Sequence, residues 1–349
     1  MIFSLRCFAN FAALRHFPGD FQIDRRRRGV VSVFRVRSLE RKFKKIKRHI
    51  SRFALFLFCV SLRAESFRVA EYNLDNYLDQ PTETRRSAKS EEAKAKIRES
   101  IRAMKPDVIA LEEMGSTNAL LELRASLKAE GLDFPYWEHV SGFDTNIHLA
   151  VLSKFPITAR RPHTNENFLL DGKRFSVSRG FLEVDIQVNT NYSFTLVGAH
   201  LKSKRSVPEA DEAELRLQEA KLLRAKVDAV LKADPNVNLI VLGDFNDTKD
   251  SASTKAILGT GKARLVDTRP AERNGDDAAA RNSRSNAMNV TWTYYYGTED
   301  TYSRIDYILL SLGMAKEWIK DGTYVLATPN WGVGSDHRPI VAAFETSNK

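Results

Sequence analysis

The chain has 349 residues, of which 43% are hydrophobic and 28% charged, a composition typical of a soluble globular protein with one large domain or two ordinary ones. The formal net charge of +10 invites a nucleic-acid-binding interpretation, but 16 of the 54 basic residues and only 3 of the 44 acidic residues lie in residues 1–64. The other residues carry 38 basic and 41 acidic side chains, a net charge of −3, so the total charge is no evidence for nucleic-acid binding.

Residues 1–64 are predicted to be a leader that contains a signal peptide. A basic run at 41–48 precedes an apolar core at 53–62, which is short for a bilayer span and suitable for a signal peptide. Cleavage is expected after Ala64, although Leu62 is larger than the residue preferred near a cleavage site. We therefore expect an exported protein, periplasmic or extracellular, and the alternative is a membrane anchor formed by an uncleaved 53–62 segment. The residues before about position 39 exceed what a signal peptide needs, which indicates a start codon assigned too far upstream.

Residues 65–349 are predicted to form one domain. Both cysteines, Cys7 and Cys59, precede this segment, so neither disulfides nor thiol chemistry contribute to it. Strands and helices alternate along it without a linker or a repeat, which favours one α/β domain over two.

Three helices are expected in this segment, at 82–104, 118–130 and 209–231. Pro106 closes the first of them. Apolar runs predict strands at 67–74, 107–114, 147–152, 180–188, 194–201, 237–242, 291–296 and 303–310, and a last strand follows Pro339. The polar segment 262–289 is expected to be a long loop, and such loops are often functional.

Six of the expected strands begin or end at polar side chains suited to catalysis. In chain order these are Asn73, Glu113, His200, the pair Asp244 and Asn246, Asp306, and the pair Asp336 and His337. Each short motif alone is weak evidence, because a stretch such as Gly-Asp-Phe-Asn at 243–246 occurs in many turns. Six of them in one order are informative.

This order resembles that of the endonuclease/exonuclease/phosphatase superfamily, whose members include DNase I, abasic-site exonucleases, sphingomyelinases and inositol polyphosphate phosphatases. The resemblance covers about residues 66–344. It implies a DNase I-like four-layered α/β sandwich, in which two packed mixed β-sheets are flanked by helices and the active site lies where these strands end. Alternation alone predicts only a mixed α/β protein with many strands.

Phosphodiester hydrolysis needs an activated water, neutralisation of charge in the transition state and a stabilised leaving oxygen. A hard divalent cation held by carboxylates supplies much of the last two as a Lewis acid. The resemblance implies Mg²⁺, with Mn²⁺ or Ca²⁺ as alternatives, and it implies Glu113, Asp336 and Asn73 as metal-site residues. Glu112 stands where relatives often have Gln, and either a supporting role at the metal or an exposed, solvated carboxylate is open for it.

The catalytic residues implied are His200, Asp244, Asn246, Asp306 and His337. Asp244 and Asn246 are two residues apart on a turn, so Asp244 is a candidate to orient or deprotonate water and Asn246 to bind a phosphate oxygen. His337 and Asp306 resemble the imidazole–carboxylate dyad of the family, and His200 resembles its second phosphate-facing histidine. Whether Asp244 or His337 removes the proton is left open.

Four residues are predicted to bind substrate: Asn73, Asn146, Arg179 and Lys202. Asn73 is expected to hydrogen-bond within the metal site or to the phosphate, and Lys202 to neutralise a phosphate. Asn146 and Arg179 flank strands at positions where relatives contact substrate, with an ordinary loop hydrogen bond as the alternative for each.

Three functions are compatible with these motifs. The run His-Leu-Lys-Ser-Lys at 200–204 resembles that of extracellular bacterial nucleases and favours a secreted, metal-dependent nuclease acting on DNA or RNA. The alternative is a sphingomyelinase-like enzyme, or another lipid or small-molecule phosphodiesterase or phosphatase. Such enzymes often expose aromatic hairpins to a membrane, but alternation at 291–296 more simply predicts a strand with one buried face. A catalytically inactive binding protein is the weakest hypothesis, because the candidate residues are intact.

We expect a monomer without an obligate protein partner.

Overall fold

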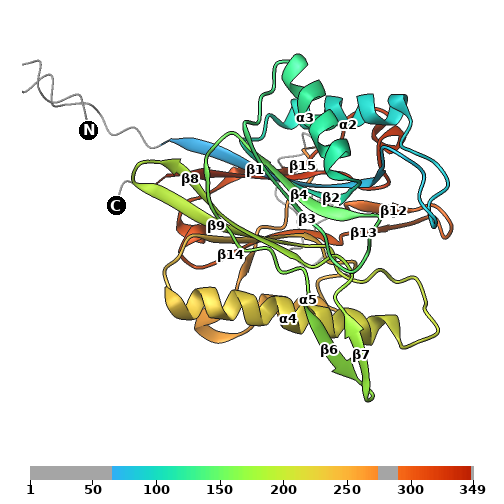
Figure 1. Cartoon of the computed structure of the whole chain (residues 1–349). Helices are drawn as coiled ribbons and strands as arrows, with labels where there is room; N and C mark the ends of the chain where they lie inside the picture. The colour runs from blue at the N-terminus through green and yellow to red at the C-terminus, as the bar shows by residue number, and fades with distance from the viewer. Residues whose placement is uncertain (1–64, 274–289, 347–349) are drawn as a thin grey trace, which may run out of the picture. The chain divides into compact units, whose positions relative to one another are not determined.

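Two six-stranded β-sheets lie face to face in the computed structural model, which describes residues 65–273 and 290–346 (Figure 1). In spatial order the first sheet contains β15 (Trp318–Val325), β16 (Ile340–Glu345), β1 (Ser66–Tyr77), β2 (Val108–Met114), β4 (His148–Ser153) and β3 (Tyr136–Val140). The second contains β11 (Val266–Asp267), β14 (Asp306–Leu310), β10 (Leu239–Asp244), β9 (Tyr192–Ala199), β8 (Phe181–Asn189) and β5 (Ile157–Arg160). Both sheets are mixed, because β1 pairs with β2 and β9 pairs with β10 in parallel while the other neighbours are antiparallel.

Helices cover the outer face of each sheet (Figure 1). The first sheet carries α2 (Glu91–Met104) and α3 (Thr117–Ala129), and the second carries α4 (Glu212–Ala233) and α5 (Ala252–Leu258). Each helix begins after a residue whose side chain accepts hydrogen bonds from the first-turn amides, namely Ser90, Ser116, Asp211 and Ser251. Short 3₁₀ turns occur at η1 (Gly261–Ala263), η3 (Met314–Lys316) and η4 (Trp331–Val333).

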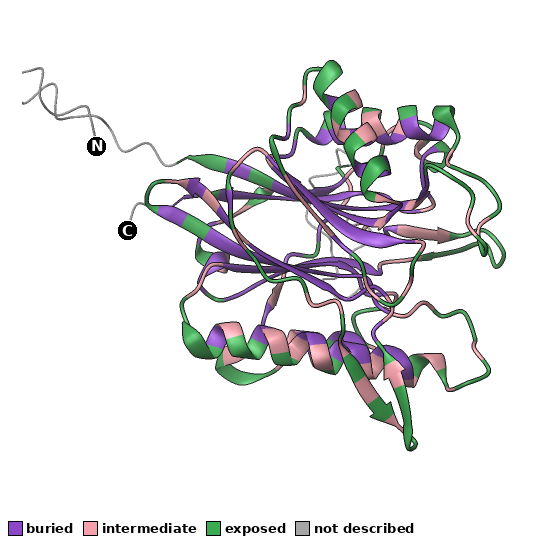
Figure 2. Cartoon of the chain, viewed as in Figure 1, coloured by how far each residue is buried: buried purple, intermediate pink, exposed green. Residues whose placement is uncertain are grey.

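The core has three layers of buried side chains, one between the sheets and one under each pair of helices. Along β2, Val108 faces the other sheet while Ile109 faces α2 and α3; along β10, Ile240 faces the other sheet while Val241 faces α4. The central strands are thus buried on both faces, which explains why they form continuous apolar runs in the sequence (Figure 2). The predicted four-layered sandwich is confirmed.

The first and last described residues of the domain, Glu65 and Thr346, are hydrogen-bonded to each other. β1 and β16 pair antiparallel from Ser66 opposite Glu345 to Glu71 opposite Ile340. Next to this ladder, the amide of Glu65 donates to Oγ1 of Thr346 at 2.9 Å, and the amide of Thr346 donates to the carbonyl of Glu65 at 2.8 Å. The last strand of the chain therefore lies in the middle of the first sheet.

Some predicted elements differ from the structure in length. The helix expected at 82–104 begins only at Glu91, because Ser90 caps it and a turn between Thr82 and Arg85 is closed by its own hydrogen bonds. The strand expected at 291–296 is reduced to β12 (Tyr294–Tyr296), which pairs only with β13 (Thr301–Ser303). The expectation of one buried face is wrong, because the three tyrosines of β12 are half-buried or exposed.

A second separate hairpin completes the described structure, and two predicted segments lie wholly or partly outside it. The hairpin of β6 (Asn167–Leu170) and β7 (Lys173–Ser176) protrudes past α4 (Figure 1). The predicted leader lies outside the described residues, as do positions 274–289 of the loop expected at 262–289. Within the described segments, no helix combines the length and the apolar character needed to cross a bilayer.

The buried histidine His148 is expected to make stability depend on pH. Burial, and next the charge of His139, lowers the pKa of His148 to about 4, so folding favours its neutral form. Its contribution is complete above pH 6.5 and is lost as the pH falls toward 4. Between pH 7 and pH 5 the free energy of unfolding should fall by about 2 kcal/mol more in the wild type than in a His148→Gln variant. Urea unfolding at both pH values measures this difference, and equal decreases would contradict it.

Candidate active site

Polar residues at the ends of parallel-paired strands from the two sheets meet at one end of the sandwich. Asn73 ends the regular part of β1, and Asp244 is the last residue of β10. The Nδ2 amide of Asn73 donates to Oδ2 of Asp244 at 3.0 Å, and Nε2 of His200 lies 3.5 Å from the same oxygen. The cluster therefore contains residues from both sheets and exists only when the sheets are packed together.

The backbone at these strand ends has conformations that turn the side chains into the cluster. Gly243 has a φ of +131°, and a Cβ there would overlap the carbonyl oxygen of Ala199 on β9. Asn246 and Glu113 have φ values of +53° and +56°, in the left-handed region that is costly for a glutamate. Backbone strain of this kind is common at functional sites.

Replacing Gly243 by alanine is expected to lower the free energy of unfolding by about 3 kcal/mol or more, because strain and overlap act together. Gly172→Ala is a matched control: that glycine has a φ of +76°, but no atom lies within 4 Å of the point that a Cβ would occupy. The control should lose about 1 kcal/mol. Denaturant midpoints measure both values, and equal losses would show that the approach of β10 to β9 does not require glycine.

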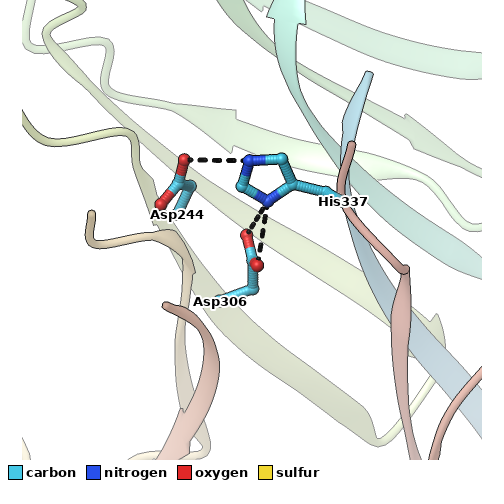
Figure 3. Close-up of side chains that lie close together, drawn as sticks. All are labelled: Asp244, Asp306 and His337. Atoms are coloured by element: carbon cyan, nitrogen blue, oxygen red, sulfur yellow. Dashed lines mark hydrogen bonds and ion pairs between the residues drawn. The ribbon is translucent and has the colours of Figure 1, made fainter. Parts of the chain in front are cut away.

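His337 and Asp306 form the predicted imidazole–carboxylate pair (Figure 3). Nδ1 of His337 lies 3.1 and 3.0 Å from the two carboxylate oxygens of Asp306, and both residues are buried. On its other side, Nε2 of His337 lies 3.8 Å from Oδ2 of Asp244 and 3.8 Å from Oδ1 of Asp336. The pair thus directs Nε2 toward the carboxylates at the end of the sandwich.

Two buried hydroxyl groups hold this pair in place. Oγ1 of Thr293 accepts hydrogen bonds from the amide of Asp306 at 3.3 Å and from the amide of Ile305 at 3.2 Å. Oγ of Ser335 accepts from the amide of His337 at 3.0 Å and donates to the carbonyl of Asn73 at 2.8 Å. Ser335 therefore connects the His337 loop to β1.

Burial and neighbouring charges give the two histidines opposite protonation states. Burial alone would lower the pKa of His337, but the carboxylates of Asp306 and Asp244 outweigh it and raise that pKa well above its ordinary value. Burial lowers the pKa of His200 well below its ordinary value, and the charge of Arg179 adds to this effect. At neutral pH, His337 is therefore an imidazolium and His200 is neutral.

Asp244 is the central carboxylate of the cluster. Burial, and next the charge of Asp306, raises the pKa of Asp244 to about 7. Its Oδ1 accepts from the amide of Asn246 at 2.8 Å, and its Oδ2 accepts from the side chain of Asn246 at 3.3 Å. The carboxylate is thus oriented from two sides and has a pKa close to neutral pH.

Side chains that could bind a cation lie at two places. Asp244, Asp306 and His337 offer ligand atoms that all lie within 4.8 Å of one another and could hold a metal ion. However, the bond between His337 and Asp306 occupies two members of this group. Glu113 and Asp336 are more open to solvent, which suits an ion that keeps several of its own waters.

Glu113 is also positioned by the loop after β1. Its Oε2 accepts from the amide of Asn76 at 3.0 Å, and its Oε1 lies 4.0 Å from Nε2 of His200. The surrounding protein, and more weakly the charges of Asp75 and Glu113, raises the pKa of Asp336 to about 6. The predicted metal-site residues thus form an acidic group to which a cation would add favourable charge.

Glu112, beside Glu113, points into the interior. It is 1% exposed, so the alternative of an exposed, solvated carboxylate is wrong. Burial raises its pKa to about 8 and raises that of the equally buried Glu71 well above the ordinary value. At neutral pH the protonated carboxyl group of Glu71 or Glu112 can therefore donate a hydrogen bond to the carboxyl group of the other residue. The two buried side chains then do not both carry an unpaired negative charge.

The side chains of two predicted residues donate hydrogen bonds to backbone carbonyls, Asn246 to a neighbouring loop and Lys202 to its own loop. The side-chain amide of Asn246 donates to the carbonyl of Leu201 at 3.0 Å. The ammonium of Lys202 donates to the carbonyls of Ser203 and Arg205 at 3.0 and 2.7 Å. The structure places Asn246 in the cluster, while Lys202 is turned into its own loop and its contact with substrate stays a prediction.

Arg179 and Asn146 lie on neighbouring loops at the rim. Arg179 is buried, its Nη1 donates to the carbonyl of Leu201 at 3.3 Å, and its Nε lies 3.9 Å from Oδ2 of Asp144. Asn146 donates its side-chain amide to Oγ1 of Thr84 at 3.3 Å. The loop hydrogen bond considered as the alternative for these two residues is therefore present, and substrate contact stays a prediction for both.

Arg85 is a further cation at the site that the sequence did not indicate. It donates to the side chain of Asn76, and its charge adds to the effects that lower the pKa of His200. The sequence placed residue 85 in a helix, where its side chain would have no defined relation to His200. The nearest signal was the pair Arg85 and Arg86 shortly after Asn73, in a segment without clear apolar spacing.

Comparison with known proteins places this geometry in a family. Residues 70–337 match the model of the Endonuclease/Exonuclease/phosphatase family. The catalytic domain of human Nocturnin with bound sulfate is similar with a TM-score of 0.56 and 17% identity, over 81% of this chain and 98% of that one. Beta toxin from Staphylococcus aureus has a TM-score of 0.56 and 18% identity, over 79% and 99% of the two chains. Truncated TDP2 from Caenorhabditis elegans has a TM-score of 0.54 and 16% identity, over 80% and 98%. At these identities the likeness shows the fold alone, and no curated protein sequence matches the chain.

Proposed function

The chain belongs to the Endonuclease/Exonuclease/phosphatase family, and from this premise we propose that it is a metal-dependent phosphodiesterase that cleaves DNA or RNA. Family membership supports the hydrolysis of phosphoester bonds as its reaction. The observation that carries the proposal is the buried cluster of His337, Asp306 and Asp244, joined to β1 through Asn73. It combines a fixed positive charge with a carboxylate that titrates near neutral pH.

In the proposed mechanism Asp244 is the general base. A protonated imidazole has no free lone pair, so His337 in its charged form cannot accept a proton from water. Asp244 has a pKa of about 7 and can accept one at neutral pH, where a general base is most efficient. The hydrogen bonds from Asn73 and Asn246 keep its carboxylate in one orientation during this transfer.

His337 then serves to stabilise charge. Its Nε2–H faces the open end of the cluster and can donate to a phosphate oxygen as negative charge develops there. Asp306 keeps the ring in this orientation and favours its charged form. His200, neutral and buried with Nε2 beside Asp244, can donate a second hydrogen bond without adding charge.

Glu113 and Asp336 are the residues that would hold a divalent cation, with Asn73 close to them as a neutral oxygen donor. When bound, Mg²⁺, or Mn²⁺ or Ca²⁺ in its place, supplies Lewis-acid stabilisation of the phosphate. Three carboxylates, those of Glu113, Asp336 and Asp75, support this assignment. Within the described residues their ion pairs supply two cations, Lys89 at 3.3 Å from Asp75 and the imidazolium of His337 at 3.8 Å from Asp336, and Glu113 is paired only with the neutral His200 at 4.0 Å.

Two cations beside the cluster, the half-buried Arg85 and the buried Arg179, favour nucleic acid as the substrate. The guanidinium groups of Arg85 and Arg179 both lie close enough to His200 to affect its pKa. They could contact phosphates next to the one that is cut, which a polyanion offers and a small phosphate ester does not. Secretion stays a prediction, because it rests on the leader alone.

The function is tested by incubating the purified full chain with Mg²⁺, Mn²⁺ or Ca²⁺ and plasmid DNA, RNA, sphingomyelin vesicles or bis-p-nitrophenyl phosphate. We expect metal-dependent cleavage of at least one nucleic acid. Cleavage of sphingomyelin without cleavage of either nucleic acid would replace the nuclease with a lipid phosphodiesterase. Inactivity on all four substrates would support a binding protein instead.

A further inference from the structure

The hairpin of β12 and β13 is fastened to the loop that carries His337. The amide of Tyr295 donates to the carbonyl of Asp336 at 3.0 Å, and the amide of Arg338 donates to the carbonyl of Thr293 at 2.6 Å. These bonds form an antiparallel bridge between Tyr294 and His337. The position of the hairpin relative to the catalytic imidazole is therefore fixed by the backbone.

One face of this hairpin continues the row of rings that starts at His337. Tyr294 and Tyr296 are two residues apart on β12, so their side chains share a face. The ring of Tyr294 lies 4.7 Å from that of His337, and the ring of Tyr296 follows at 6.3 Å with an interplanar angle of 25°. Tyr296 is 40% exposed, so the row leads from the reacting centre to solvent.

The opposite face of the hairpin holds it rigid. Tyr302 lies opposite Tyr295 in the ladder, with its ring 4.9 Å from that of Tyr295 and 4.8 Å from that of Trp292. Trp292 in turn contacts Trp331 at 5.4 Å and covers the guanidinium of Arg338 at 3.3 Å. The exposed row of Tyr294 and Tyr296 is thus supported from behind and loses little freedom when a ligand stacks on it.

We propose that Tyr294 and Tyr296 form a stacking subsite for the nucleobase next to the phosphate that is cut. This inference rests on the proposed nuclease function and names the part of the substrate that the hairpin binds. Flat tyrosine rings in a row suit flat bases, and such stacking tolerates any base because every base has a π face. The subsite favours base-bearing diesters and reads no sequence.

The residues at the tip of the hairpin favour a base over a lipid surface. Positions 297–300 read Gly-Thr-Glu-Asp, all exposed, and contain two carboxylates and no apolar side chain. Oδ1 of Asp300 accepts from the hydroxyl of Tyr295 at 3.0 Å. Carboxylates are costly to insert into a bilayer, so the tip is unsuited to membrane insertion. They also repel a nucleic-acid backbone, so the subsite holds one or two bases rather than a long strand.

The test compares an oligothymidylate with an oligomer of the same length made of abasic tetrahydrofuran residues, both cut by the full chain. The wild type should have the higher kcat/KM on the oligothymidylate. In Tyr296→Ala the ratio of the two kcat/KM values should fall by about 10- to 100-fold, and Tyr296→Phe should keep it. Tyr136→Ala is the matched control, because this tyrosine, 37% exposed, lies on the edge strand β3, outside the hairpin, and its replacement should leave the ratio at its wild-type value.

Three other results of this test would each contradict a different part of the proposal. An unchanged ratio in a Tyr296→Ala variant with a wild-type melting temperature would overturn the stacking subsite while leaving the nuclease intact. An unchanged ratio together with a selective loss of activity on sphingomyelin vesicles would assign the hairpin to lipid. If the wild type cuts neither oligomer and neither plasmid DNA nor RNA, the proposed function itself fails, which is seen before any variant is made. If it cuts RNA alone, the same comparison uses oligouridylate and an abasic ribose oligomer that keeps the 2′-hydroxyl groups.

Discussion

Replacing His337 by alanine is expected to lower the rate of phosphodiester hydrolysis by about 10³- to 10⁴-fold while the protein stays folded. In the proposed mechanism the imidazolium provides the positive charge that faces the phosphate, and its removal also leaves Asp306 buried without its partner. Asp306→Asn should lower the rate by a similar factor, because an amide can neither hold the charged form of His337 nor fix its ring. Steady-state hydrolysis of plasmid DNA or bis-p-nitrophenyl phosphate measures both effects.

The control for this experiment is His163→Ala. His163 is also paired with a carboxylate, Glu183 at 2.8 Å, but it lies outside the cluster. It should retain nearly full activity. If His337→Ala and Asp306→Asn kept wild-type rates, the dyad would be structural and the catalytic centre would have been placed wrongly.

Replacing Glu113 by glutamine is expected to lower the rate by about 10³-fold at saturating Mg²⁺, since a Lewis acid contributes several kcal/mol to transition-state stabilisation. Glutamine keeps the size of the side chain and can still accept from the amide of Asn76, so the fold should be unaffected. Chelation with EDTA should abolish activity in the wild type, and added Mg²⁺ should restore it. The variant should need more Mg²⁺ for half of its maximal rate.

Glu209→Gln is the matched control, because this glutamate is exposed on the segment before α4. It should leave the metal dependence unchanged. A Glu113→Gln enzyme with the wild-type requirement for Mg²⁺ would move the metal to the group formed by Asp244, Asp306 and His337.

The sequence predicted the parts of the fold that are buried on both faces. β2 and β10 have continuous apolar runs, and β1 and β9 have mostly apolar ones. Each run stops at a polar residue that the structure places in or beside the cluster. The edge strand β15 was not predicted, because it is mostly half-exposed and interrupted where its register shifts between Ile319 and Tyr324. Without two buried faces, an edge strand lacks the pattern that distinguishes it from a loop.

The site could be predicted in part for the same reason. Asp306 and His337 border strands of the two sheets, and the resemblance to the family implied that they form a pair. Arg85 and Lys202 are on loops, where the direction of a side chain depends on local hydrogen bonds that have no periodicity. The sequence therefore did not indicate Arg85, and it could not show that the side chain of Lys202 turns into its own loop.

The hydrogen bonds between Glu65 and Thr346 fix the point at which the preceding residues of the chain join the domain. β1 runs from Ser66, next to these hydrogen bonds, to Asn73 at the active site, seven steps of about 3.3 Å, so the two points are about 23 Å apart. Whether the chain is cut after Ala64 or stays attached to what precedes it, the attachment point at Glu65 is at the end of β1 away from the cluster of Asn73, Asp244 and His337. Removal of the residues before Glu65 would therefore change the chain at the opposite end of β1 from Asn73, about seven residues away from the cluster.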